Sequence, residues 1–171
     1  MDYWGWFTSN GNSFSAIAAL LACAVAFVTL IAQRQHNRLS VRPLAQVDFR
    51  DGESRLLVKL VNNGTGPLIV DSLSVWESGE RIGDALIDAL PEVEGLFEDF
   101  VANIDGRSIP AGGAIVLLDF IPEGESAAMD RFALRKALAR LEIRLTYRDI
   151  YNGLNPVYSR DLRWFGRMLD T

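Results

Sequence analysis

The chain has very few of the residues that support metal binding or nucleophilic catalysis. It contains one cysteine, Cys23, and one histidine, His36. A single cysteine excludes an intrachain disulfide, and zinc sites built from several cysteines and histidines are excluded by the same count. The sequence also lacks a G-x-S-x-G elbow, a Walker loop, a dinucleotide fingerprint and an EF-hand loop. We therefore expect no catalytic, cofactor-binding or metal-ligating residues.

Basic residues are outnumbered by acidic ones, and they are absent from the first part of the chain. The net charge is -5, from 17 basic and 22 acidic residues. A protein that binds nucleic acid needs a positive surface to neutralise phosphates, so this composition argues against nucleic acid as the main ligand. Arg34 is the first basic residue, so every basic residue follows the first apolar stretch.

That stretch is a long apolar run from Phe14 to Ala32 without a charged residue. As a helix it rises roughly 28 Å, close to the ~30 Å hydrocarbon layer of a bilayer. A cleaved signal peptide would carry positive charge before the run, whereas residues 1–13 contain Asp2 and no basic residue. The run therefore predicts a transmembrane helix over 14–32, after a short extracytoplasmic leader over 1–13.

Three arginines, Arg34, Arg38 and Arg42, lie in a basic juxtamembrane linker over 33–43. By the positive-inside rule, they predict an N-terminus outside and a cytoplasmic C-terminal domain, at the inner (plasma) membrane. An uncleaved anchor with an external domain is the alternative, and the one-sided charge disfavours it. The same arginines can attract anionic lipid headgroups.

Small side chains recur along the run at spacings of three and four residues, at Ser15, Ala19, Ala22, Ala26 and Thr29. A stripe of small residues lets two helices approach closely, and its hydroxyl groups can add hydrogen bonds. The stripe predicts a homo-oligomer, or pairing with another membrane protein, through these residues. A monomeric anchor in the bilayer is the alternative.

The remaining residues, 44–171, have the length of one domain. Short runs rich in valine, isoleucine and leucine, separated by turn signals, predict strands over 44–49, 55–61, 67–76, 114–120 and 141–148. The first three are expected to be antiparallel strands. Asn152-Gly153 marks a hairpin after the last of them.

Two stretches show helical patterns instead. An amphipathic helix is expected over 84–102, kinked or divided at Pro91, because apolar residues recur there at spacings of three and four. A second helix is expected over 127–140. The first stretch is strongly acidic: nine carboxylates between Glu77 and Asp105 accompany one basic residue, Arg81.

Two turn-containing segments, VKLVNNGTGPLIVDSLSVW and SIPAGGAIVLLDF, carry a family resemblance. They resemble immunoglobulin-like modules in which an N-x-G turn joins two strands and a P-x-G turn precedes a later one. With the single span and the HNRLSVRP junction, the chain resembles small, uncharacterised bacterial single-span membrane proteins that carry such a domain. The resemblance implies a mainly β fold, an antiparallel immunoglobulin-like β-sandwich, here with two helical insertions. It carries over no ligand or catalytic residues.

Three functions are compatible with these patterns. The first is a membrane-anchored protein-interaction or scaffold module, which would bind an unidentified protein partner through a sheet edge or the acidic helix. The second is an oligomeric membrane effector or sensor whose span perturbs the membrane. The third is an enzyme that relies on carboxylates brought together by the fold. The lack of catalytic motifs favours the first.

Overall fold

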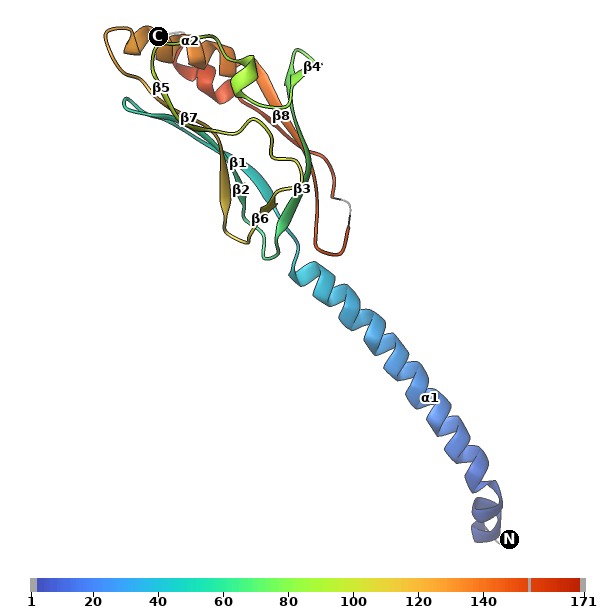
Figure 1. Cartoon of the computed structure of the whole chain (residues 1–171). Coiled ribbons are helices and arrows are strands. Elements are labelled where there is room, and N and C mark those ends of the chain that lie inside the picture. Colours follow the sequence, from blue (N-terminus) through green and yellow to red (C-terminus); the bar gives the residue numbers. More distant parts are fainter. Residues whose placement is uncertain (1–2, 154, 170–171) are drawn as a thin grey trace. The chain divides into compact units, whose positions relative to one another are not determined.

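The computed structural model describes residues 3–153 and 155–169, with side chains from residue 13 onward. The chain forms two compact units, one ending at Ser40 and the other beginning at Val41 (Figure 1). The first unit is helical, and the second contains mainly antiparallel strands.

The first unit is the long helix α1, Tyr3–Ser40. Within its segment Ser13–Ser40, an 18-residue window has a mean hydropathy of 2.6, and no residue of that window is buried. By length and composition this helix can cross a bilayer, as the apolar run predicts. The helix also includes most of the expected leader and most of the expected linker. It ends shortly before Pro43, whose ring disfavours helical conformation in the preceding residue.

Sheet A contains four antiparallel strands in the order β1-β2-β7-β5. Their bounds are β1 Ala45–Asp51, β2 Leu56–Asn62, β7 Ala114–Ile121 and β5 Leu96–Phe100. The tight turn at Gly52 joins β1 to β2, in a register that pairs Ala45 with Asn62. β1 and β5 are therefore the two edges of this sheet.

Sheet B has the order β4-β3-β8-β9, and the short strand β6 also pairs with β3. The bounds are β4 Glu80–Gly83, β3 Leu68–Glu77, β8 Leu141–Arg148, β9 Tyr158–Asp161 and β6 Ser108–Ile109. Every second residue of β8, from Leu141 to Tyr147, is buried. The alternating strand predicted over 141–148 is thus confirmed.

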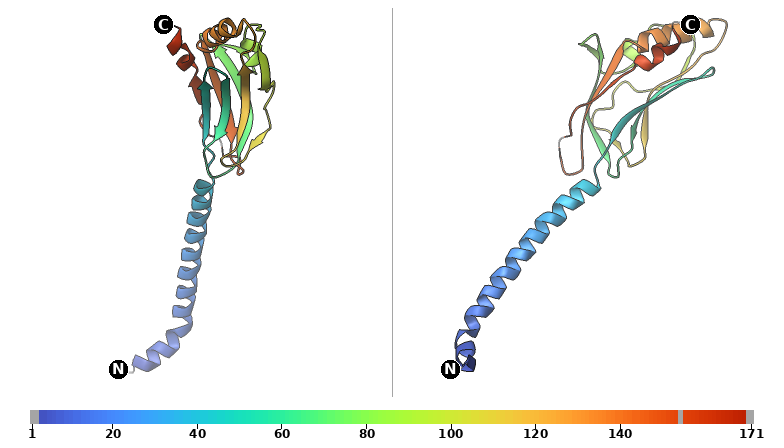
Figure 2. Two further views of the ribbon diagram at one scale, coloured as in Figure 1. Left: turned by 90° about the vertical axis from the view of Figure 1, so that its left-hand side faces the viewer. Right: turned by 180° about the vertical axis from the view of Figure 1, so that it is seen from behind.

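Figure 2 shows the two sheets from two further sides. Their buried side chains form one hydrophobic core. Helix α2, Ala127–Leu138, and the 3-10 helix η2, Arg163–Met168, contact each other at one end of the sheets, which we call the helix end. Leu134, Leu138 and Phe165 are fully buried there. The helix predicted over 127–140 is therefore present as α2.

The opposite end, which we call the turn end, contains the turns 62–66 and 110–113. Asn62 holds it together, because this fully buried side chain forms hydrogen bonds in both directions. Its Nδ2 donates to the Gly66 carbonyl at 2.8 Å and the Ile109 carbonyl at 3.0 Å. Its Oδ1 accepts from the backbone N–H of Leu44 at 3.1 Å and of Gly64 at 3.0 Å.

Gly66 is also required at the turn end for steric reasons. A Cβ on this residue would lie 1.8 Å from the carbonyl oxygen of Val41, so the first residues of the second unit approach the turn too closely for any side chain.

The three antiparallel strands predicted over 44–76 are present as β1, β2 and β3, but they divide between the two sheets. β1 and β2 pair, but β3 belongs to sheet B. The NNGTGP turn crosses from one sheet to the other because Asn62 anchors it to β6, which lies beside β3. Turn residues indicate where the chain reverses, and they do not specify which strand becomes the partner.

The prediction of an amphipathic helix over 84–102 is wrong. This stretch contains only the 3-10 turn η1, Ile87–Ala89, and then strand β5. Leu90 precedes Pro91 and is extended, with φ -100° and ψ 150°, which stops the helical turn. Downstream, backbone pairing with β7 outweighs the helical spacing of the apolar residues.

Strand β4 was not predicted from the sequence. It forms a hairpin with β3 through Ser78 and Gly79, which have φ values of 52° and 88°. A Ser-Gly pair between two runs is a recognised signal for a hairpin turn of this kind.

Candidate interaction surface

The acidic stretch that was expected to be a helix forms an edge of sheet A. β5 pairs with β7 on one side and is the last strand of the sheet on the other. Leu96 and Phe100 are 50% and 47% exposed, and Glu98 and Asp99 between them are exposed as well. Phe97 turns inward and packs against Phe120, with the two ring centroids 5.2 Å apart. The edge thus presents apolar and acidic side chains together.

A bulge shapes this edge. The register with β7 shifts between Phe97 and Asp99, so Glu98 is an extra residue on β5. Its carboxylate accepts a hydrogen bond from Arg55 Nη2 at 2.7 Å. The guanidinium of Arg55 also contacts both carboxylate oxygens of Asp119, whose side chain is only 3% exposed.

Arg55 therefore connects the bulge in β5 to the neighbouring strand β7, which contains Asp119. The hydrogen bond to Asp119, followed by the negative charges of Asp119 and Glu98, raises the pKa of Arg55 despite partial desolvation. The guanidinium stays charged, and it holds two carboxylates that would otherwise repel each other. The conformation of the edge is consequently fixed by a three-residue ion cluster.

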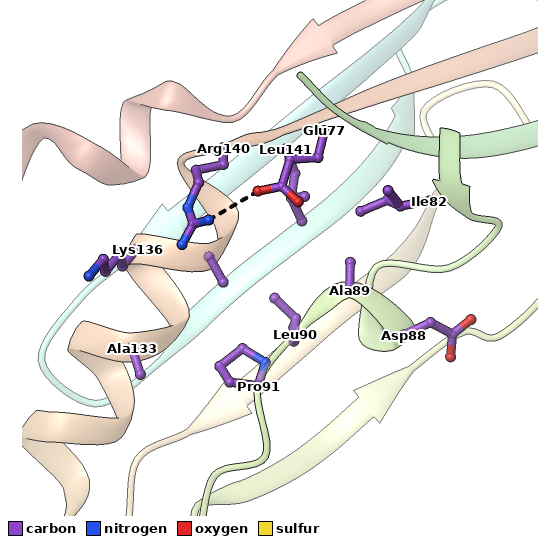
Figure 3. Close-up of a pocket in the computed structure, with 11 residues that line it drawn as sticks. Glu77, Ile82, Asp88, Ala89, Leu90, Pro91, Ala133, Lys136, Arg140 and Leu141 are labelled. Carbon is purple, nitrogen blue, oxygen red and sulfur yellow. Dashed lines mark hydrogen bonds and ion pairs between the residues drawn. The ribbon is translucent and has the colours of Figure 1, made fainter. Parts of the chain in front are cut away.

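The same acidic stretch also forms a wall of a groove at the helix end (Figure 3). The groove has a volume of about 580 Å³ and lies between α2, the β3–β4 hairpin and residues 88–91. Lys136 of α2 and Arg140, which follows α2, lie on one side, and Asp88 lies on the other. Arg140 pairs with Glu77 at 3.2 Å, which links the basic C-terminal part of the chain to the acidic stretch.

The other long edge of the sheets is covered. In β1 the backbone N–H of Val47 donates to the Tyr158 hydroxyl at 2.9 Å. Phe49 packs against Trp164 and Phe165 of η2, with ring centroids 4.8 and 5.6 Å apart. The edges of sheet B are strands of four residues each, β4 and β9. β5 is thus the edge best placed to accept another strand.

The buried carboxylates are bound to arginines. The Asp51 side chain is fully buried, and both of its oxygens accept hydrogen bonds from Arg135, at 2.7 to 3.1 Å. Arg167 lies 3.4 Å from the same carboxylate. Within the described residues, no group of three or more His, Cys, Asp or Glu side chains is arranged to hold a metal ion. In this arrangement the buried carboxylates connect elements of the fold.

The residues singled out from the sequence lie in both units. The small-residue stripe, namely Ser15, Ala19, Ala22, Ala26 and Thr29, lies on α1 with its side chains exposed. The Thr29 hydroxyl donates to the Val25 carbonyl of its own helix at 2.8 Å. Its hydrogen-bond donor is therefore satisfied without a neighbouring helix.

The three arginines divide between the units. Arg34 and Arg38 are exposed on α1, whereas Arg42 belongs to the second unit, where its carbonyl accepts from Thr65 N–H at 3.2 Å. Sequence reasoning did not identify the Arg55 cluster or the role of Asn62. Arg55 and Asp119 are 64 positions apart, so no local pattern marks their pairing.

Comparison with models of known families, with curated proteins and with solved structures finds no match to this chain.

Proposed function

We propose that the protein is a single-pass membrane-anchored interaction module without catalytic activity of its own. Its second unit would be an immunoglobulin-like β-sandwich that binds a protein partner in the cytoplasm. The observation that carries this proposal is the fusion of a membrane-length apolar helix to a domain with an open, acidic edge strand. The arginines that follow the span support the cytoplasmic orientation.

The side chains of the β5 edge indicate what kind of partner segment it would bind. Strand addition gives main-chain hydrogen bonds, while exposed side chains on the edge select what is added. From Glu92 to Phe100 the chain has four carboxylates and no basic residue. An extended segment with basic residues and apolar residues to contact Leu96 and Phe100 would complement this edge in both respects.

Cross-linking in intact cells tests this proposal. A photoreactive side chain at Leu96 on β5 should capture one partner of discrete mass. The same side chain at Glu80, an exposed residue of the β4 edge, should capture little. Asp99→Lys should reduce the Leu96 adduct about fivefold, because repulsion of a basic partner changes affinity by about 1 kcal/mol. Equal adducts at both edges, or no effect of Asp99→Lys, would contradict strand addition at β5.

Association through the span is a second, separable part of the proposal. The small side chains of the stripe would allow α1 to pack closely against a second copy, forming the oligomer that a membrane effector also requires. Ala22→Ile adds a bulky side chain to the centre of the stripe and should lower the mass of the detergent-solubilised assembly. Val28→Ile, which alters a side chain outside the stripe, should leave it unchanged. An identical mass for all three proteins would eliminate this contact.

A further inference from the structure

The loop between β8 and β9 exposes several apolar side chains at the turn end. Ile150 is 50% exposed, Tyr151 is 47% exposed and Val157 is 58% exposed. At the same end of the domain, Leu44 is 53% exposed. Exposed apolar residues are common on protein surfaces, so what these side chains can contact depends on where the loop lies in the domain.

Residues 149–153 of the loop are held in a defined conformation by Asp149. The Oδ1 atom of this residue accepts from the backbone N–H of Tyr151 at 2.8 Å and of Gly153 at 2.7 Å. This Asx-type turn engages the carboxylate within the loop and leaves Ile150 and Tyr151 exposed at the tip. The apolar tip is therefore preorganised.

The loop lies at the end of the domain where the chain enters from α1. Strand pairing places Arg148 opposite Ile69, three residues after Gly66. Gly66 in turn lies against Val41, the first residue of the second unit. Val41 directly follows the last residue of α1 in the sequence. The loop and the attachment point thus share the turn end.

The length of the connection keeps this end close to a bilayer that α1 spans. The apolar run ends at Ala32, and eight further helical residues lead to Ser40. Eight residues rise about 12 Å, whereas the headgroup layer is roughly 5–7 Å thick on each side. The turn end therefore stays near the headgroup layer. Its effective concentration at the bilayer surface is consequently high.

We infer that the tip of the β8–β9 loop, at Ile150 and Tyr151, is a second membrane contact that inserts into the interfacial layer of the bilayer. This inference rests on the proposed membrane anchoring. A tyrosine suits this layer because its ring is apolar and its hydroxyl is polar. Exposed Arg42 at the same end suits anionic headgroups. With the loop in the interface, the helix end and its groove point toward the aqueous phase.

Site-directed spin labelling of the full chain tests the contact. Cys23→Ser removes the native thiol, and Tyr151→Cys, Ser78→Cys or Ala22→Cys then provides one labelling site per protein. Each protein is reconstituted into vesicles of phosphatidylcholine and phosphatidylglycerol. The ratio of accessibility to oxygen over a water-soluble nickel chelate reports the depth of the label.

The label at position 151 should give a ratio severalfold higher than the label at 78, which lies on the β3–β4 turn at the other end of β3. A ratio at 151 equal to that at 78 would overturn the inference. The label at 22 tests the anchoring separately, because a hydrocarbon-depth ratio there with a water-like ratio at 151 rejects the loop contact alone. A water-like ratio at 22 would reject the membrane anchoring itself.

Discussion

Asn62→Asp should destabilise the second unit by about 3–5 kcal/mol at neutral pH. The substitution preserves size and keeps the oxygen that accepts from Leu44 and Gly64. However, it replaces the donor that faces the carbonyls of Gly66 and Ile109 with a second acceptor, inside a fully buried site. Thermal unfolding of the detergent-solubilised chain, followed by tryptophan fluorescence, should show a fall of roughly 10 °C or more.

The adjacent residue provides a matched control. Asn63 is exposed and donates to the Gln46 side chain at 2.7 Å, so Asn63→Asp should change stability by less than about 1 kcal/mol. Lowering the pH should restore part of the stability that Asn62→Asp loses. Burial and the facing carbonyls disfavour the ionised carboxylate of the new aspartate, and its protonation restores one hydrogen-bond donor. Similar melting temperatures for the two variants would contradict the role assigned to Asn62.

Arg135→Met should cost about 2–4 kcal/mol, because it leaves the fully buried Asp51 carboxylate without the arginine that donates to both of its oxygens. Arg167, 3.4 Å away, can compensate only in part. The thermal midpoint of the same detergent-solubilised chain measures this loss. Arg140→Met removes an exposed pair with Glu77 and should cost less than about 1 kcal/mol.

A double variant separates charge from packing in this prediction. Combining Asp51→Asn with Arg135→Met removes the uncompensated charge while keeping both volumes close to the original ones. The double variant should therefore be more stable than Arg135→Met alone. If it is less stable, the arginine acts mainly by packing against its neighbours, and the buried ion pair is not the source of the effect.

The sequence predicts those elements whose pattern is local. α1 and β8 follow from an uninterrupted apolar run and a strict alternation, and both are present where expected. The helix α2, Ala127–Leu138, begins where the apolar spacing indicates. In each case neighbouring residues within a few positions determine the conformation.

The missed features depend on residues that are distant in sequence. Segment 96–100 has a helical spacing of apolar residues, yet pairing with β7 makes it a strand. Likewise, Arg55 finds Asp119 and Glu98 only after β2, β7 and β5 have assembled. The sequence patterns indicate either a sheet edge or the acidic segment as the binding surface. In the structure the acidic segment includes a sheet edge, so the two candidates coincide in part.

The bulged, acidic β5 edge has a consequence for how the protein behaves at high density. Proteins anchored as proposed are confined to two dimensions, where collisions between copies are far more frequent than in solution. Under those conditions an open edge strand favours pairing between the edges of neighbouring copies, which would build continuous sheets. The row of carboxylates makes two copies electrostatically incompatible at this edge. The features that would recruit a basic partner would therefore also keep the crowded protein from forming fibres.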